Sequence, residues 1–189
     1  MAQALVVVDA QNEFSADGKR AVPNHEAALA AIRVHVDLAR RQRRPIAWVQ
    51  HYNKPHESPA FVPGTWGAAL SEGFGPEENH GPERLFQKDV FGAFTGTDLE
   101  AWLRANDVNS VLVVGFYAHM CLSTSVREAL VRGFDVTVDP NATAARDLED
   151  MVLGSQTAED VKRSALLQLK HMGARVFVAE LVATARQVS

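Results

Sequence analysis

The stretch that decides the fold is Leu5-Val6-Val7-Val8-Asp9-Ala10-Gln11-Asn12-Glu13-Phe14, close to the start of the chain. Its first four residues form an unbroken apolar run that ends at Asp9. Such a run is typical of a strand buried on both faces, as in a parallel sheet. Because no basic segment precedes it, we expect an N-terminal strand here and not a signal peptide.

Similar runs recur along the chain and alternate with helical patterns. We expect further strands at Ile46–Val49, Leu85–Phe86, Val111–Val114, Phe134–Val138 and Arg175–Val178. We expect helices after Asn24, after a capping box at Thr97–Glu100, from Cys121 to the C-cap Gly133, and from Thr157 to Gly173. This alternation, with right-handed crossovers, predicts an α/β fold with a doubly wound sheet.

Residues 52–84 break the alternation. The segment contains five of the eight prolines and shows no clear period. Long irregular loops in compact domains are usually functional, so we interpret this one as a lid that carries Phe61, Trp66 and Phe74 over a site. The alternative is a surface excursion that the same aromatic residues hold down.

Bulk composition limits the classes of function. The chain has 189 residues, one cysteine and a net charge of -4, and its length suits a single domain over residues 1–189. The acidic balance argues against nucleic acid or an anionic membrane as a partner. No apolar stretch of about 18 residues is present to span a bilayer. A lone cysteine cannot form an intrachain disulfide and fits the reducing cytoplasm, so we expect a cytoplasmic protein.

Three polar residues follow expected strand ends, where ligands bind in doubly wound sheets: Asp9, Lys88 and Cys121. Each has an ordinary structural interpretation when taken alone, as a turn former, a surface charge or a buried thiol. Cys121, however, begins an expected helix. The free N–H groups and the positive dipole end there favour a thiolate and could hold an oxyanion.

Four segments, in order, resemble the isochorismatase-like cysteine hydrolases. They are the opening Asp9–Phe14, the lysine segment Lys88–Leu99, the nucleophile turn Gly115–Leu122 and the strand end Asp135–Ala144. In the lysine segment, Gly92 stands where the family more often has Ser. Four motifs in register over most of the chain form a far more specific signal than any one of them.

The resemblance implies a three-layer α/β fold around a mostly parallel six-stranded sheet. It also implies a catalytic triad of Asp9, Lys88 and Cys121, and a cis peptide bond between Phe116 and Tyr117. The backbone N–H groups of Tyr117 and Cys121 would then hold an oxyanion. Oligomers are common in the family, so we expect a homodimer or homotetramer; the apolar tail Leu181–Val188 could pack on a neighbour or fray.

Retention of Cys121 favours cleavage of a C–N bond in a small amide, carbamoyl or ureido substrate through a thioester. One alternative is vinyl-ether hydrolysis of the isochorismatase type, which does not need the cysteine. Another is a non-catalytic binding or scaffold protein on the same fold. A dinucleotide-binding oxidoreductase is disfavoured, because no Gly-x-Gly-x-x-Gly follows the first strand.

Nicotinamidases of the family bind a metal through an Asp-x-His motif and further histidines. This chain has His51 and His56, but Val49 occupies the carboxylate position, so we expect neither a metal nor another cofactor. Side chains expected to contact a substrate are Phe14, His51, Trp66, Phe94 and His119. For Phe14 and Phe94, packing in the core explains the sequence almost as well.

Overall fold

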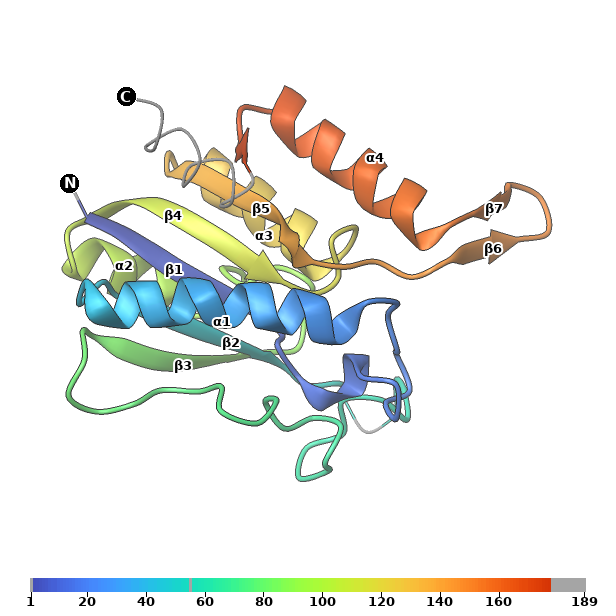
Figure 1. The fold of residues 1–189 in the computed structure, drawn as a ribbon, viewed down its shortest axis with the longest axis horizontal. Helices are drawn as coiled ribbons and strands as arrows, with labels where there is room; N and C mark the ends of the chain where they lie inside the picture. The colour runs from blue at the N-terminus through green and yellow to red at the C-terminus, as the bar shows by residue number, and fades with distance from the viewer. Residues whose placement is uncertain (1, 55, 178–189) are drawn as a thin grey trace.

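The computed structural model describes residues 2–54 and 56–177. Six strands form one parallel sheet in the order β3-β2-β1-β4-β5-β8 (Figure 1). Their bounds are β1 Ala2–Val8, β2 Ile46–His51, β3 Glu83–Lys88, β4 Val108–Gly115, β5 Asp135–Thr143 and β8 Arg175–Val176. All six expected strands are present, and the α/β fold class is confirmed. Val178 and the tail Leu181–Val188 lie outside the described residues.

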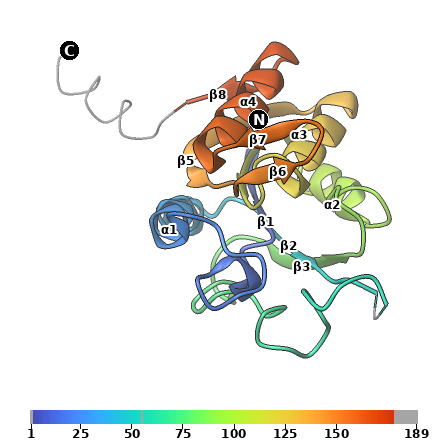
Figure 2. The ribbon, with the colours of Figure 1, turned by 90° about the vertical axis from the view of Figure 1, so that its right-hand side faces the viewer.

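Helices cover both faces of the sheet and complete three layers (Figure 2). They are α1 His25–Arg41, α2 Leu99–Ala105, α3 Cys121–Val131 and α4 Ala158–His171. Successive strand residues point to opposite faces, so Leu5 and Val7 pack with α1, whereas Val6 and Val8 pack with the other three helices. Because β1 is apolar on both faces, it occupies the centre of the sheet, which explains its unbroken apolar run.

The chain leaves β1 toward α1 on one face and leaves β4 toward α3 on the other. The connections that follow these neighbouring strands therefore run to opposite faces of the sheet, and doubly wound sheets typically bind ligands at such a point. Asp9 and Cys121 follow these two strand ends, so the sheet order alone brings them together.

The expected capping box at Thr97–Glu100 is wrong. Asp98 is the N-cap of α2 and makes no side-chain cap bond. Glu100 pairs with Arg104 and Arg132 and so does not turn back to the helix start. At α4 the expectation is confirmed, since the hydroxyl of Thr157 accepts the Asp160 N–H at 3.2 Å.

The described part of segment 52–84 is irregular up to residue 82, and its last two residues belong to β3. Its aromatic side chains do not converge on one place. Phe61 packs on His51 with ring centroids 5.3 Å apart, Phe74 packs on Trp48 at 5.9 Å, and Trp66 is 56% exposed. Phe74 thus holds the segment against the body of the protein, as the alternative interpretation expected.

The hairpin of β6 (Leu148–Asp150) and β7 (Gly154–Gln156) was not expected from the sequence. It projects from the carboxyl end of β5, beyond the start of α4 (Figure 1). None of the described helices is long and apolar enough to cross a membrane.

Candidate active site

Asp9, Lys88 and Cys121 meet at the carboxyl end of the sheet. Asp9 follows β1 with a left-handed backbone (φ 52°), and Lys88 is the last residue of β3. The Lys88 Nζ donates to Asp9 Oδ2 at 2.9 Å, and both side chains are buried. Cys121 is the first residue of α3 and lies close enough to both for their charges to act on its thiol. The three residues predicted from strand ends therefore form one cluster.

Lys88 reaches across the end of β2 to arrive at Asp9. On the way its ammonium contacts His51 Nδ1 at 3.2 Å and donates to the Val90 carbonyl at 3.1 Å. Burial alone would lower the pKa of Lys88, but the Asp9 carboxylate and the neighbouring Cys121 outweigh it, so the pKa is raised. Lys88 therefore remains a cation and is paired with Asp9 beside the thiol.

His51 is occupied on both ring nitrogens. Burial and the nearby Lys88 charge lower its pKa, so the ring is neutral near pH 7. Because Lys88 can only donate, Nδ1 is the acceptor, and Nε2–H donates to Asn53 Oδ1 at 2.9 Å. His51 lies directly against the triad, where it orients Lys88.

The residues present do not fit the metal site of the family's nicotinamidases. Val49 offers no ligand atom, His56 is exposed, and the nitrogens of His51 already hold Lys88 and Asn53. The described residues contain no group of three His, Cys, Asp or Glu side chains suited to a metal. No step of the chemistry below is routed through a metal.

The thiol of Cys121 is not set up as a resting thiolate. Burial and the Asp9 carboxylate raise its pKa, and the Lys88 ammonium only partly opposes them. The expectation of a thiolate at the helix start is therefore corrected: the helix begins where predicted, but burial, together with the adjacent carboxylate, keeps the proton on sulfur. A hydrogen bond between the thiol and Asp9 also raises the thiol pKa, and no other described group bonds the buried Asp9 Oδ1, so Asp9 can receive that proton.

The nucleophile turn carries two free backbone donors. The Phe116–Tyr117 peptide bond is cis, at the position that the resemblance implies. The neighbouring N–H groups are bonded: Phe116 N–H donates to Val8 O, and Ala118 N–H donates to Ala144 O. Among the described residues, the N–H groups of Tyr117 and Cys121 donate to no backbone carbonyl outside regular elements. These two donors are those expected to hold an oxyanion.

Two polar residues of the opening motif hold the site together, and the sequence analysis gave them no role. Gln11 donates its side-chain amide to His51 O and Ala68 O and accepts the His51 N–H at 2.9 Å, so it fixes the end of β2. Glu13 is buried and accepts the N–H groups of Lys19 and Phe61. The signal for these roles in the sequence was the presence of a glutamine and a glutamate close to a buried strand end.

Helix α3 also fixes the loop that follows Lys88. Ser125 accepts the Ala93 N–H at 3.0 Å and donates to Cys121 O at 2.6 Å. Glu128 accepts the Phe94 N–H at 2.9 Å and the Thr95 hydroxyl. Residues 121, 125 and 128 share one helix face, and this spacing was the signal in the sequence. One helix face thus positions both Cys121 and the lysine segment.

The residues expected to contact a substrate lie in different environments. Phe14 is buried against Phe61, Phe116 and Tyr117, and Phe94 is buried beside Phe134, so both serve the core. These contacts agree with the packing alternative. Trp66 lies on the exposed surface of the irregular segment, and no contact of its ring with the triad is found among the described residues.

His119 is a candidate ligand-binding residue. Its ring stacks on Tyr117 with centroids 5.0 Å apart, and both buried ring nitrogens lack a partner among the described residues. Burial and the charge of Arg146 lower its pKa to about 4, so the ring is neutral at physiological pH. Arg146, which the sequence analysis missed, also acts on Tyr117. It lies two residues beyond Ala144, whose carbonyl accepts the Ala118 N–H.

Fold and site together define a class: three-layer α/β proteins with a buried Asp–Lys pair and a cysteine at the start of a helix beside the central strand. The chain belongs to the isochorismatase family, since the Isochorismatase domain model matches residues 3–180. The family includes hydrolases that act on amide bonds.

Individual similarities cover most of the chain. The Secreted isochorismatase effector Isc1 of Verticillium dahliae is 34% identical over 76% of this chain and 73% of its own length. A putative isochorismatase from Burkholderia xenovorans has a TM-score of 0.85 at 29% identity, covering 98% of this chain and 87% of its own. N-carbamoylsarcosine amidase from Thermoplasma acidophilum has a TM-score of 0.77 at 26% identity, covering 94% and 96%.

Proposed function

We propose that this chain is a cysteine-dependent amidohydrolase that cleaves a C–N bond in a small molecule. The observation that carries the proposal is the buried Lys88–Asp9 pair beside the thiol of Cys121. A buried ion pair is costly to desolvate, and stability alone does not require it at this position. Similarity to an amidase supports the same reaction class.

The raised thiol pKa assigns the first step to Asp9. As the substrate carbonyl docks, Asp9 takes the proton from Cys121 while the sulfur attacks the carbonyl carbon. The tetrahedral oxyanion is held by the N–H groups of Tyr117 and Cys121. Asp9 then gives the proton to the leaving nitrogen, the C–N bond breaks, and an acyl thioester remains on Cys121.

Water completes the cycle. Asp9 takes a proton from a water molecule that attacks the thioester, and this proton passes to the departing sulfur, which restores the thiol. Lys88 stays charged throughout, because its role is to hold Asp9 in place and balance its charge. His51 acts through Lys88 and is a positioning residue.

Arg146 and His119 support a finer proposal, that the substrate carries an anionic group such as a carboxylate. Arg146 makes no salt bridge with a described residue, and its charge reaches the ring of His119 beside the nucleophile turn. A guanidinium suits a carboxylate through paired hydrogen bonds. The vinyl-ether alternative is disfavoured because such chemistry has no use for Cys121.

The test is ammonia release from a panel of small amides, carbamoyl and ureido compounds, each tried as the free carboxylate and as its neutral ester. Cys121→Ala should abolish turnover, while Ser164→Ala, at a half-buried position on α4 that contacts none of Asp9, Lys88 and Cys121, should leave it unchanged. Full activity of Cys121→Ala would refute the nucleophile. Arg146→Ala should raise KM for the carboxylates by about tenfold or more and spare the esters.

A further inference from the structure

The tip of the β6–β7 hairpin is an exposed apolar surface. Met151, Val152 and Leu153 follow one another at the turn and are 104%, 91% and 88% exposed. We call these three residues the hairpin tip. Figure 1 shows the hairpin reaching away from the body of the protein. Consecutive large apolar side chains at such a projection mark an interaction surface.

The hairpin tip is held in one conformation. Asp150 Oδ1 accepts the N–H groups of Val152 and Leu153, both at 2.8 Å, and Gly154 takes the left-handed conformation (φ 81°) that closes the turn. The flanking residues Leu148 and Gln156 pair in the antiparallel ladder. A tip ordered in advance loses little conformational entropy when a partner binds it.

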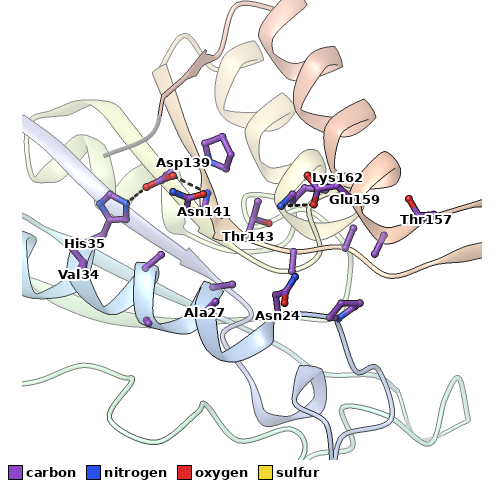
Figure 3. A pocket seen from close by; sticks show the side chains of 18 of the residues that line it. Asn24, Ala27, Val34, His35, Asp139, Asn141, Thr143, Thr157, Glu159 and Lys162 are labelled. Atoms are coloured by element: carbon purple, nitrogen blue, oxygen red, sulfur yellow. Dashed lines mark hydrogen bonds and ion pairs between the residues drawn. The ribbon is translucent and has the colours of Figure 1, made fainter. Parts of the chain in front are cut away.

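A groove of about 930 Å³ lies beside the base of the hairpin, between α1, the end of β5 and the start of α4 (Figure 3). We call it the α1 groove. Most of its charged groups are paired within the chain. His35 bonds Asp139 at 2.8 Å on the floor, and Lys162 pairs with Glu159 at 3.0 Å. Asp147, which also lines the groove, accepts the Ala158 N–H at the start of α4 at 2.7 Å. The lining therefore offers an anionic ligand no unpaired cation.

What the α1 groove offers a partner is apolar surface. Ala27, Ala31 and Val34 line it along one side of α1, and Val34 is 58% exposed. Residues at this spacing share one helix face. Small side chains form a shallow recess into which larger apolar side chains such as Met or Leu fit.

The hairpin tip and the α1 groove cannot meet within one chain. Asp147 and Thr157 both line the groove, and the hairpin runs out from between them and points away. We propose that the hairpin tip of one copy inserts into the α1 groove of a second copy, and that the exchange is reciprocal about a two-fold axis. This surface goes beyond the proposed hydrolase activity and does not depend on it.

The areas involved favour a second copy over an unrelated partner. Each tip side chain exposes roughly 60–120 Å² of apolar surface, so one tip supplies roughly 200–350 Å². Stable interfaces bury about 800 Å² on each partner. A single inserted tip falls well short of this. In a reciprocal pair each copy contributes both a tip and a groove, together with the α1 surface between them.

Directed cross-linking tests the contact. Cys121 is the only native cysteine, so Met151→Cys and Val34→Cys are each made in a Cys121→Ser background, mixed and oxidised. We expect a disulfide-linked dimer between the two variants. Leu167→Cys, exposed on α4, replaces Val34→Cys in the matched control and should give far less product. Equal yields, or no product with Val34→Cys, would overturn the proposal.

Sedimentation of the full chain with Cys121 intact gives a second test. Wild type should be a dimer, and a variant with serine at all three tip positions should have a dissociation constant raised by about tenfold or more. Val131→Ser, which alters an apolar side chain that is 83% exposed at the end of α3, should not change it. A monomeric wild type, or an unchanged dissociation constant in the triple serine variant, would show that the proposal is wrong.

Discussion

Gly92→Ala tests whether one face of α3 positions the lysine segment. A Cβ atom at residue 92 would collide with the carboxylate of Glu128, far inside van der Waals contact. Gly92 does not have a left-handed backbone, so alanine adds no conformational strain, and its whole cost is this collision. The carboxylate must move, and it then loses the Phe94 N–H and the Thr95 hydroxyl.

The magnitude follows from those two bonds. Hydrogen bonds to a charged acceptor contribute about 1.5–3 kcal/mol each, and solvent at this half-buried carboxylate favours the lower figure. We therefore expect Gly92→Ala to lower the free energy of unfolding by about 3 kcal/mol. In a chain of this size that lowers Tm by roughly 6–12 °C. The kcat for an amide substrate should fall as well, because Lys88 and Cys121 lose their common support.

A double-mutant cycle separates this explanation from general damage. Glu128→Asp withdraws the carboxylate by one methylene, so it should relieve the collision, and the double variant should be more stable than the two single costs predict. We expect a coupling of about 1–2 kcal/mol in urea unfolding. Strictly additive costs, or a Gly92→Ala variant within about 0.5 kcal/mol of wild type, would refute the reasoning. The same contact accounts for glycine where the family more often has serine.

Three further predictions concern charges. Asp9→Asn should abolish turnover yet speed alkylation of Cys121 by iodoacetamide at neutral pH, because the anion that raises the thiol pKa is gone while Lys88 remains; slower labelling would contradict this. The pKa of His119, about 4 in the folded chain, lies below the unfolded value near 6.5. The contribution of the neutral ring to the free energy of unfolding is therefore complete above pH 6.5 and is lost as pH falls toward 4. His119→Phe should reduce the loss of unfolding free energy between pH 7 and pH 5 by about 1 kcal/mol, and an unchanged pH slope would argue against it. Glu13→Ala leaves two backbone N–H groups unsatisfied and should cost about 2–4 kcal/mol in urea unfolding, whereas Glu13→Gln, which keeps one acceptor, should cost less; equal losses would count against hydrogen bonding as the cause.

Much of the fold could be predicted because buried strands and helices carry apolar residues in characteristic patterns along the sequence. The run Leu5–Val8 is apolar on both faces because the central strand is covered on both, and Asp9 marks the strand end with the first polar side chain. Asp9, Lys88 and Cys121 were candidates because they follow strand ends, and parallel strands bring their carboxyl ends to one edge; their grouping as a triad was what the family resemblance implied. The fold class and family membership are therefore confirmed, while the catalytic roles stay proposals.

Other features left no such trace. The β6–β7 hairpin is short and exposed, so it needs no apolar period and its strands could not be recognised. Thr97 and Glu100 fit a capping box, and Thr97 Oγ1 accepts the Leu99 N–H at 3.3 Å, but Glu100 forms ion pairs with Arg104 on the next turn of the helix and with Arg132. Arg146 acts on His119 only through the return of the chain after β5, a contact that spacing in the sequence does not reveal. The cytoplasmic location and the oligomeric state stay predictions.

Lys88 crosses the end of β2 to reach Asp9, so the site is assembled from segments that are far apart along the chain. This order has a consequence during protein synthesis. Asp9, His51 and Lys88 all leave the ribosome before Cys121, so the acidic and cationic half of the site is made first. Until α3 docks through Ser125 and Glu128, neither Asp9 nor Lys88 lies beside Cys121. If Asp9 is the base, as proposed, an incomplete or misassembled chain has no partner for the thiol, and activity arises only on correct assembly.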